Sequence, residues 1–172
     1  GANCMQESLK KGEVTTLPGV NTIADGTAVK TPGKNIFPYI QKNLDDIITV
    51  PDEELVVAFL DIVENHKMVV ENSGLLTVAA LKHLNVQNQR VVSILSGGNM
   101  DIITMSSVVQ QGLIFRDRIF TVSVLLPDKP GELVKVANTI AKQQGNVIKL
   151  DHNQFVSVNR NAAVELKVTL EC

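Results

Sequence analysis

The seven residues SILSGGN (residues 93–99) close an apolar run with a serine, two glycines and an amide. The run begins earlier, at Val91 and Val92. After it, apolar residues return at helical spacing, at Met100, Ile102, Ile103, Val108 and Val109. This pattern predicts a buried strand that turns into a helix, with the polar residues at the turn. In α/β proteins, turns at the ends of strands are where ligands commonly bind.

Composition limits the classes of protein to which the chain can belong. With 172 residues, 44% of them hydrophobic, it can bury one large core or two small ones. Lys and Arg number 16 against 18 Asp and Glu, and aromatic residues make up 3%, so we expect no nucleic-acid partner. No signal peptide or 18-residue apolar span is evident, so we expect no membrane contact and a cytoplasmic setting. Cys4 and Cys172 have neither metal-ligand nor disulfide spacing and are interpreted as plain thiols.

Helical and extended patterns alternate before residue 116. The expected strands are residues 47–50, 68–70 and 90–95, and the expected helices are residues 2–11, 38–44, 52–67 and 73–84. Acidic residues open the third of these helices and Lys67 closes it, as the helix dipole favours. The alternation predicts an α/β fold with parallel strands.

The pattern changes after Phe115. A strand at 119–126 is followed by the turn PDKPG (127–131), a helix at 132–144, and two strands at 146–150 and 163–170. This β-α-β-β order is most of a ferredoxin-like unit, which a further helix and strand would complete. We therefore expect two domains, residues 1–115 and 116–172, with the second incomplete. Because the chain also starts without an initiator Met, we expect it to be part of a longer protein.

Four interpretations of SILSGGN are open from the residues alone. The glycines could simply permit a tight turn. A phosphate nest is the second, but the longer glycine pattern and a following Lys are missing. A nucleophilic serine is the third, but Ile94 stands where the elbow requires a glycine before Ser96. The fourth is a serine hydroxyl that hydrogen-bonds a ring nitrogen of a cofactor at the ends of the strands.

Three segments favour the fourth interpretation. TIADG (22–26), MVVENSG (68–74) and SGGN (96–99), in this order, resemble the carboxyl-terminal part of the catalytic domain of threonine dehydratases, which are pyridoxal-phosphate enzymes of the tryptophan-synthase β fold type. The tail from Arg118 through LLPDKPGELVKVANTIAKQQGNVI resembles an ACT domain, the amino-acid-sensing module attached to these enzymes. The resemblance implies a fold of class α/β, in which part of a tryptophan-synthase-β-like domain is followed by a truncated ferredoxin-like (βαββ) ACT domain.

The resemblance implies a role for each residue of the SGG turn. Ser96 matches the serine that hydrogen-bonds the pyridine nitrogen of pyridoxal phosphate. A hydroxyl is too weak an acid to protonate that nitrogen, so the ring stays largely neutral, which suits β-elimination. Gly97 and Gly98 would let the backbone approach the plane of the cofactor, where a Cβ would collide.

Three further residues match positions near the cofactor. The resemblance places Glu71 near the ring edge, the backbone of Gly26 against the ring, and Asp25 as an acid close by. Without it, Glu71 is as readily interpreted as a solvated turn acid and Asp25 as part of an Asp-Gly turn.

The ACT-like segment implies an effector site. Gly131 matches the glycine of the ligand loop in ACT domains, and Asp128 and Asn146 lie where effector or dimer contacts fall in that family. The alternative is that an acid followed by Pro-Gly simply forms a good turn.

Departures from the family limit what this chain can do alone. The lysine that binds the cofactor aldehyde, the substrate-carboxylate loop and the glycine-rich phosphate loop precede the matching region in threonine dehydratases. The chain contains no Ser-Phe-Lys stretch and no run of three glycines, so we expect no catalytic residue here and no activity from this chain alone. The cation ligands of related enzymes would fall around residues 1–6, where Met5 and Gln6 are not acids, so we expect no metal site.

The resemblance implies that the complete protein deaminates L-threonine to 2-oxobutanoate and ammonia. It implies pyridoxal phosphate as cofactor, an amino-acid effector at the ACT domain and a homo-oligomer. Two alternatives stay open: a serine dehydratase or racemase that acts on L-serine, and an amino-acid-sensing module without catalysis.

Overall fold

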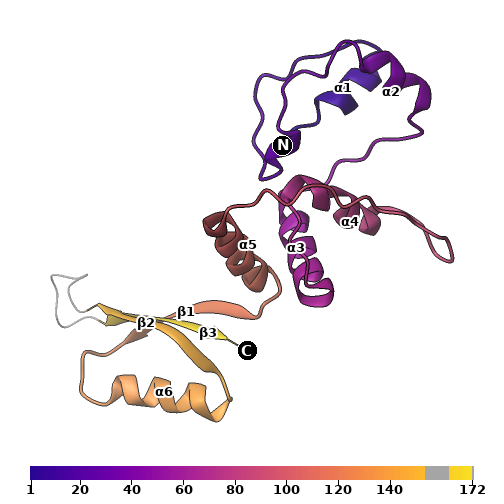
Figure 1. Cartoon of the computed structure of the whole chain (residues 1–172). Coiled ribbons are helices and arrows are strands. Elements are labelled where there is room, and N and C mark those ends of the chain that lie inside the picture. Colours follow the sequence, from indigo (N-terminus) through magenta and orange to yellow (C-terminus); the bar gives the residue numbers. More distant parts are fainter. Residues whose placement is uncertain (154–162, 172) are drawn as a thin grey trace. The chain divides into compact units, whose positions relative to one another are not determined.

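The computed structural model describes residues 1–153 and 163–171 (Figure 1). The chain divides into two compact units, Gly1–Gly112 and Leu113–Cys172. The predicted boundary at 115/116 lies close to this division.

The first unit is built from helices and turns. Its helices are α1 (Cys4–Lys11), α2 (Phe37–Asn43), α3 (Asp52–His66), α4 (Leu76–Ala79) and α5 (Ile102–Phe115), the last of which runs past the division. Three 3₁₀ turns accompany them, η1 (Asp25–Thr27), η2 (Asn72–Leu75) and η3 (Ala80–His83).

Helix α3 carries the core of the first unit. Its buried face includes Leu55 and Phe59, which are 1% and 0% exposed. Leu75 from η2 and Val108 from α5 belong to the same core. The helix ends at His66, one residue before the predicted end, because Lys67 adopts a left-handed conformation with φ of 57° that stops the helical pattern. Sequence periodicity and end signals were therefore sufficient to predict α3.

The three strands predicted in the first unit are wrong. Within the described part of the chain, residues 47–50, 68–70 and 90–95 belong to no strand. β-branched residues favour an extended backbone, but a strand also needs a neighbour with which to form a hydrogen-bonded ladder. Val92 and Ile94 are 89% and 73% exposed, so the run predicted to be buried is not buried. The parallel sheet expected from the sequence is absent from the described residues.

The single helix predicted at 73–84 is also wrong. The chain there forms η2, one turn of α-helix in α4, and η3. Gly74 lies so close to another segment that a Cβ built on it would overlap the carbonyl oxygen of Ser96. This close fit between distant segments, which periodicity does not encode, accompanies the tighter 3₁₀ geometry.

The second unit has the predicted β-α-β-β order. Strand β1 (Ile119–Leu126), helix α6 (Glu132–Lys142), strand β2 (Asn146–Asn153) and strand β3 (Val164–Glu171) follow one another. The strands form an antiparallel sheet in the order β1-β3-β2. Figure 1 shows α6 lying along this sheet. Their shared core contains Leu126, Leu166, Val168 and Leu170, with Val136 and Ile140 of α6 packed against it. The prediction of a mixed α and β chain is confirmed.

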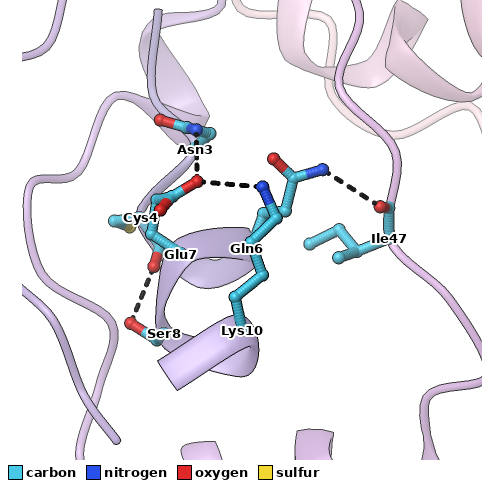
Figure 2. A network of polar contacts seen from close by, with 7 residues as sticks. All are labelled: Asn3, Cys4, Gln6, Glu7, Ser8, Lys10 and Ile47. Carbon is cyan, nitrogen blue, oxygen red and sulfur yellow. Dashed lines mark hydrogen bonds and ion pairs between the residues drawn. The ribbon is translucent and has the colours of Figure 1, made fainter. Parts of the chain in front are cut away.

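Polar side chains tie α1 to a distant loop (Figure 2). Gln6 Nε2 donates to the carbonyl oxygen of Ile47 at 3.4 Å. Within the helix, the Ser8 hydroxyl donates to the Cys4 carbonyl oxygen at 2.7 Å, and Lys10 pairs with Glu7 at 3.2 Å. Gln6, one of the two residues named in the sequence analysis as unsuited to bind a cation, therefore contacts the loop at Ile47.

Candidate functional site

Three segments that are far apart in the sequence meet at Glu71. A Cβ built on Gly97 would overlap the Glu71 carboxylate, and one built on Gly26 would lie 3.4 Å from Glu71 Oε1. The backbone N–H of Glu71 also donates to the Gly97 carbonyl oxygen at 3.3 Å. The structure thus brings Gly26, Glu71 and Gly97 together at one junction.

Gly97 is a glycine for two reasons. Its φ is +78°, in the left-handed region that other residues adopt at a cost. The space beside its Cα is filled by the Glu71 carboxylate. Gly98 is different, because the nearest atom to a Cβ there is the Val69 carbonyl oxygen at 3.8 Å, an ordinary contact.

Ser96 lies beside the same junction. Its carbonyl oxygen packs against Gly74, and the residue is exposed. Gly74 N–H donates to the Glu71 carbonyl oxygen at 2.9 Å, so η2 holds Glu71 and Ser96 close to each other through backbone contacts.

Asp25 and Glu71 both line a pocket of about 430 Å³ in the first unit. The Asp25 carboxylate accepts a hydrogen bond from Gly26 N–H at 2.9 Å, as expected in an Asp-Gly turn. The rest of the lining includes Asn72, Asn99 and Asp101. Ser96, Gly97 and Gly98 are not among the residues that line this pocket.

Two buried polar atoms lie next to Glu71 in the sequence. Asn72 Oδ1 and Ser73 Oγ have no hydrogen-bond partner among the described residues. A Cβ built on Gly26 would lie 2.7 Å from Ser73 Oγ, so this hydroxyl faces the backbone of the Asp-Gly turn. Sequence reasoning passed over both residues, because Asn-Ser-Gly reads simply as a turn.

Asp101 caps the start of α5 on the rim of the pocket. Its Oδ1 accepts the N–H groups of Ile103 and Thr104, each at 2.9 Å. Its Oδ2 accepts the Thr104 hydroxyl. These hydrogen bonds, led by that from the Thr104 side chain, hold the pKa of Asp101 below its ordinary value.

The predicted effector residues of the second unit are only partly brought together. Asp128 and Gly131 line a pocket of about 280 Å³, with His152 from β2. Asn146 is not among its lining residues, and instead its Nδ2 donates to Glu171 Oε2 at 3.2 Å. Gly131 has φ of +92° and precedes α6, and a Cβ on it would meet nothing within 4 Å.

Neither a membrane-spanning helix nor a metal-binding cluster is present among the described residues. None of their helices has the length and apolar character needed to cross a membrane. Residues 1–153 and 163–171 contain no group of three or more His, Cys, Asp or Glu side chains that could hold a metal ion.

Comparison with known proteins identifies relatives of this chain. The chain is 38% identical over 149 residues to an L-threonine ammonia-lyase of Geobacter sulfurreducens, covering 86% of the chain and 37% of that protein. It also resembles the structure of threonine deaminase isoform 2 from Solanum lycopersicum, with a TM-score of 0.60 and 30% identity, over 64% of this chain and 34% of that one.

A serine racemase is similar to nearly the same degree. The structure of the enzyme from Dictyostelium discoideum matches with a TM-score of 0.53 and 35% identity, over 59% of this chain and 33% of that one. The chain therefore spans about a third of the length of these relatives.

The predicted relationship to threonine dehydratases is confirmed by these similarities. A family profile described as pyridoxal-phosphate dependent enzyme matches residues 1–97, which include Gly26, Glu71 and Ser96. Since this match covers more than half of the 172 residues, the chain belongs to the family of pyridoxal-phosphate dependent enzymes.

Proposed function

We propose that this chain forms one side of the cofactor site of a threonine ammonia-lyase, which converts L-threonine to 2-oxobutanoate and ammonia. The observation that carries the proposal is the junction at Glu71, where Gly26 and Gly97 approach one carboxylate beside Ser96. The Geobacter sulfurreducens relative bears the name of this activity. We assign residues 1–115 to the catalytic domain and residues 116–172 to an ACT domain.

The residues at the junction fit a flat aromatic cofactor. Gly26 and Gly97 present backbone without a side chain, and a Cβ would crowd the Ser73 side chain at Gly26 and overlap the Glu71 carboxylate at Gly97. The Ser73 hydroxyl is buried, has no hydrogen-bond partner among the described residues, and lies against Gly26. Ser96 is exposed beside them, so its hydroxyl can reach a bound molecule.

Each of these residues has a definite task in the proposed site. When bound, pyridoxal phosphate supplies a ring that withdraws electrons from the α-carbon of the substrate. Ser96 would donate a hydrogen bond to the ring nitrogen without giving up its proton, because a hydroxyl is a very weak acid. Gly97 would keep the backbone close to the ring. Glu71, held between the two glycines, would lie at the ring edge, and Asp25 nearby.

A serine racemase or dehydratase is the second candidate. The Dictyostelium discoideum serine racemase is 35% identical to this chain, slightly more than the threonine deaminase from Solanum lycopersicum at 30%. The two candidates differ in substrate, L-serine in place of L-threonine, and the same junction would serve both.

We further propose that the second unit regulates the enzyme by binding an amino acid. The pocket of about 280 Å³ lined by Asp128 and Gly131 supports this proposal. Asn146, which pairs with Glu171, would act at the edge of the sheet and not in the pocket. Among the described residues, β1 pairs with β3 alone, so its free edge could pair with a second copy in a homo-oligomer.

A chimera tests the proposed activity. The matched 149 residues of the Geobacter sulfurreducens relative are replaced by this chain, and 2-oxobutanoate from L-threonine is measured beside pyruvate from L-serine. Ser96→Ala should lower kcat/KM about 5- to 150-fold, since a hydrogen bond to a buried ring atom is worth about 1–3 kcal/mol. Ser93→Ala, the same change three residues earlier, is the matched control.

Three outcomes would count against the proposal or refine it. A folded chimera that uses only L-serine would favour the second candidate. A folded chimera without either activity would contradict both. Equal effects of Ser96→Ala and Ser93→Ala would show that Ser96 does not contact the cofactor.

A further inference from the structure

Asp52 is a half-buried carboxylate outside the pocket that Asp25 and Glu71 line. It is the first residue of α3. The Thr22 hydroxyl donates to its Oδ1 at 2.6 Å, and the backbone N–H of Ile23 donates to its Oδ2 at 2.9 Å. Both oxygens are therefore engaged by one short segment, TIA (residues 22–24), which directly precedes Asp25 and Gly26.

The same segment is held from a second side by Asn72. Its Nδ2 donates to the Ile23 carbonyl oxygen at 3.0 Å, and Asn72 is 5% exposed. The Thr22 hydroxyl also accepts the N–H of Ala24 at 3.1 Å. Four hydrogen bonds, two of them to a charged group, thus hold residues 22–24, and Ala24 is 2% exposed.

These bonds connect an exposed turn to a rigid element. Asp25 and Gly26 are exposed, whereas Leu55 and Phe59 of α3 are buried in the core. Charge-assisted hydrogen bonds are shorter and stronger than neutral ones. The Asp52 carboxylate therefore holds the turn against α3 more strongly than an amide at the same position would.

We propose that Asp52 is a positioning residue of the candidate site: through Thr22 and Ile23 it sets where Asp25 and Gly26 lie relative to Glu71. Asp52 does not line the pocket that Asp25 and Glu71 share, so its effect passes through the backbone of the turn. The part of the proposal that concerns cofactor binding rests on the proposed function, whereas the part that concerns the turn does not.

The test compares Asp52→Asn with Glu53→Gln in the full chain. Both changes remove one negative charge from the first turn of α3, but Glu53 is exposed, and no hydrogen bond joins it to residues 22–24 among the described residues. An Asn side chain has one oxygen and one donor group, so either Thr22 or Ile23 loses its acceptor. Amide hydrogen exchange is measured for Ile23 and Ala24, and separately for the core of α3.

We expect Asp52→Asn to speed exchange of the Ile23 and Ala24 amides about tenfold or more relative to Glu53→Gln, with equal exchange in the core of α3 in the two variants. In the chimera with the Geobacter sulfurreducens relative, binding of pyridoxal phosphate, measured by equilibrium dialysis, should weaken about tenfold in Asp52→Asn and not in Glu53→Gln.

A second pair of variants distinguishes loss of the hydrogen bond to Asp52 from a general loss of stability. Thr22→Ser keeps the hydroxyl and should behave as wild type, whereas Thr22→Val removes it and should reproduce the Asp52→Asn exchange pattern. Equal acceleration in the turn and in the core of α3, or Thr22→Val that behaves as Thr22→Ser, would overturn the proposal. A folded chimera that binds no pyridoxal phosphate would count against the proposed function, while the exchange results would still decide the role of Asp52.

Discussion

Replacing Gly74 by Ala probes the contact between η2 and Ser96, which keeps Glu71 and Ser96 close to each other. The added Cβ would overlap the carbonyl oxygen of Ser96, and would lie 3.0 Å from the Ser96 carbonyl carbon and 2.8 Å from Val70 Cγ1. Ordinary contacts of this kind are about 3.5–4.0 Å. Val70 is 5% exposed and Gly74 is buried, so neither has free space into which to move.

The free-energy cost of Gly74→Ala depends on which atoms must move to make room for the new Cβ. The first obstacle is backbone, which cannot rotate away as a long side chain could. Relief therefore requires the 95–97 segment to move away from η2. Forcing an extra methyl into a packed site typically costs about 1–3 kcal/mol. At about 1.4 kcal/mol for each tenfold change in an equilibrium constant, this corresponds to about 5- to 150-fold more frequent opening of the first unit.

Amide hydrogen exchange followed by mass spectrometry measures this opening for each unit separately. Peptides from α3 report the first unit, and peptides from β3 report the second. Gly74→Ala should accelerate exchange in α3 by the factor above and leave β3 as in wild type, because the clash lies within the first unit. Gly19→Ala is the control, since a Cβ there would meet nothing within 4 Å.

The reasoning would be refuted by either of two results. If Gly74→Ala and Gly19→Ala exchange alike in α3, the close approach of Gly74 to Ser96 does not exist in solution. If α3 and β3 accelerate together, the substitution acts on the whole chain and not on this contact.

Three further predictions follow from single residues. Gly97→Ala should destabilise the first unit by about 1–2 kcal/mol through its φ of +78°, with Glu71 swinging aside, whereas Gly98→Ala should change denaturant unfolding by less than about 0.5 kcal/mol. The pKa of Asp101 lies below its ordinary value, so the stabilisation of α5 by its carboxylate is complete above the unfolded-state pKa. This stabilisation should be lost as the pH falls through the lower folded-state pKa. NMR of the amides in the first turn of α5 checks the loss, and Asp101→Asn should remove the pH dependence. Gly131→Ala, at φ of +92°, should strain the loop before α6 and weaken calorimetric binding of L-isoleucine to the second unit, and unchanged binding would place the effector elsewhere.

Much of the secondary structure could be predicted from local signals. Strand β1 occurs at the predicted residues, α3 and α6 differ from prediction by a residue or two at their ends, and β3 is shifted by one. Helical periodicity, acidic residues at the start and a residue suited to the left-handed conformation at the end act within a few positions of each other. The motifs TIADG, MVVENSG and SGGN are also short stretches, and their resemblance to threonine dehydratases indicated the family.

Contacts between distant segments could not be predicted in this way. The sequence alone indicated strands at 68–70 and 90–95, but whether a strand forms depends on a neighbour that supplies hydrogen bonds, and none does so among the described residues. Nor does the sequence reveal that Gly74 packs on Ser96, that Glu71 fills the space beside Gly97, or that Asp52 holds the turn at Ile23. The sequence determined which residues could form each helix, turn and motif, because those preferences are local. Only the tertiary structure decided which of them meet, because a contact across tens of residues depends on how the whole unit packs.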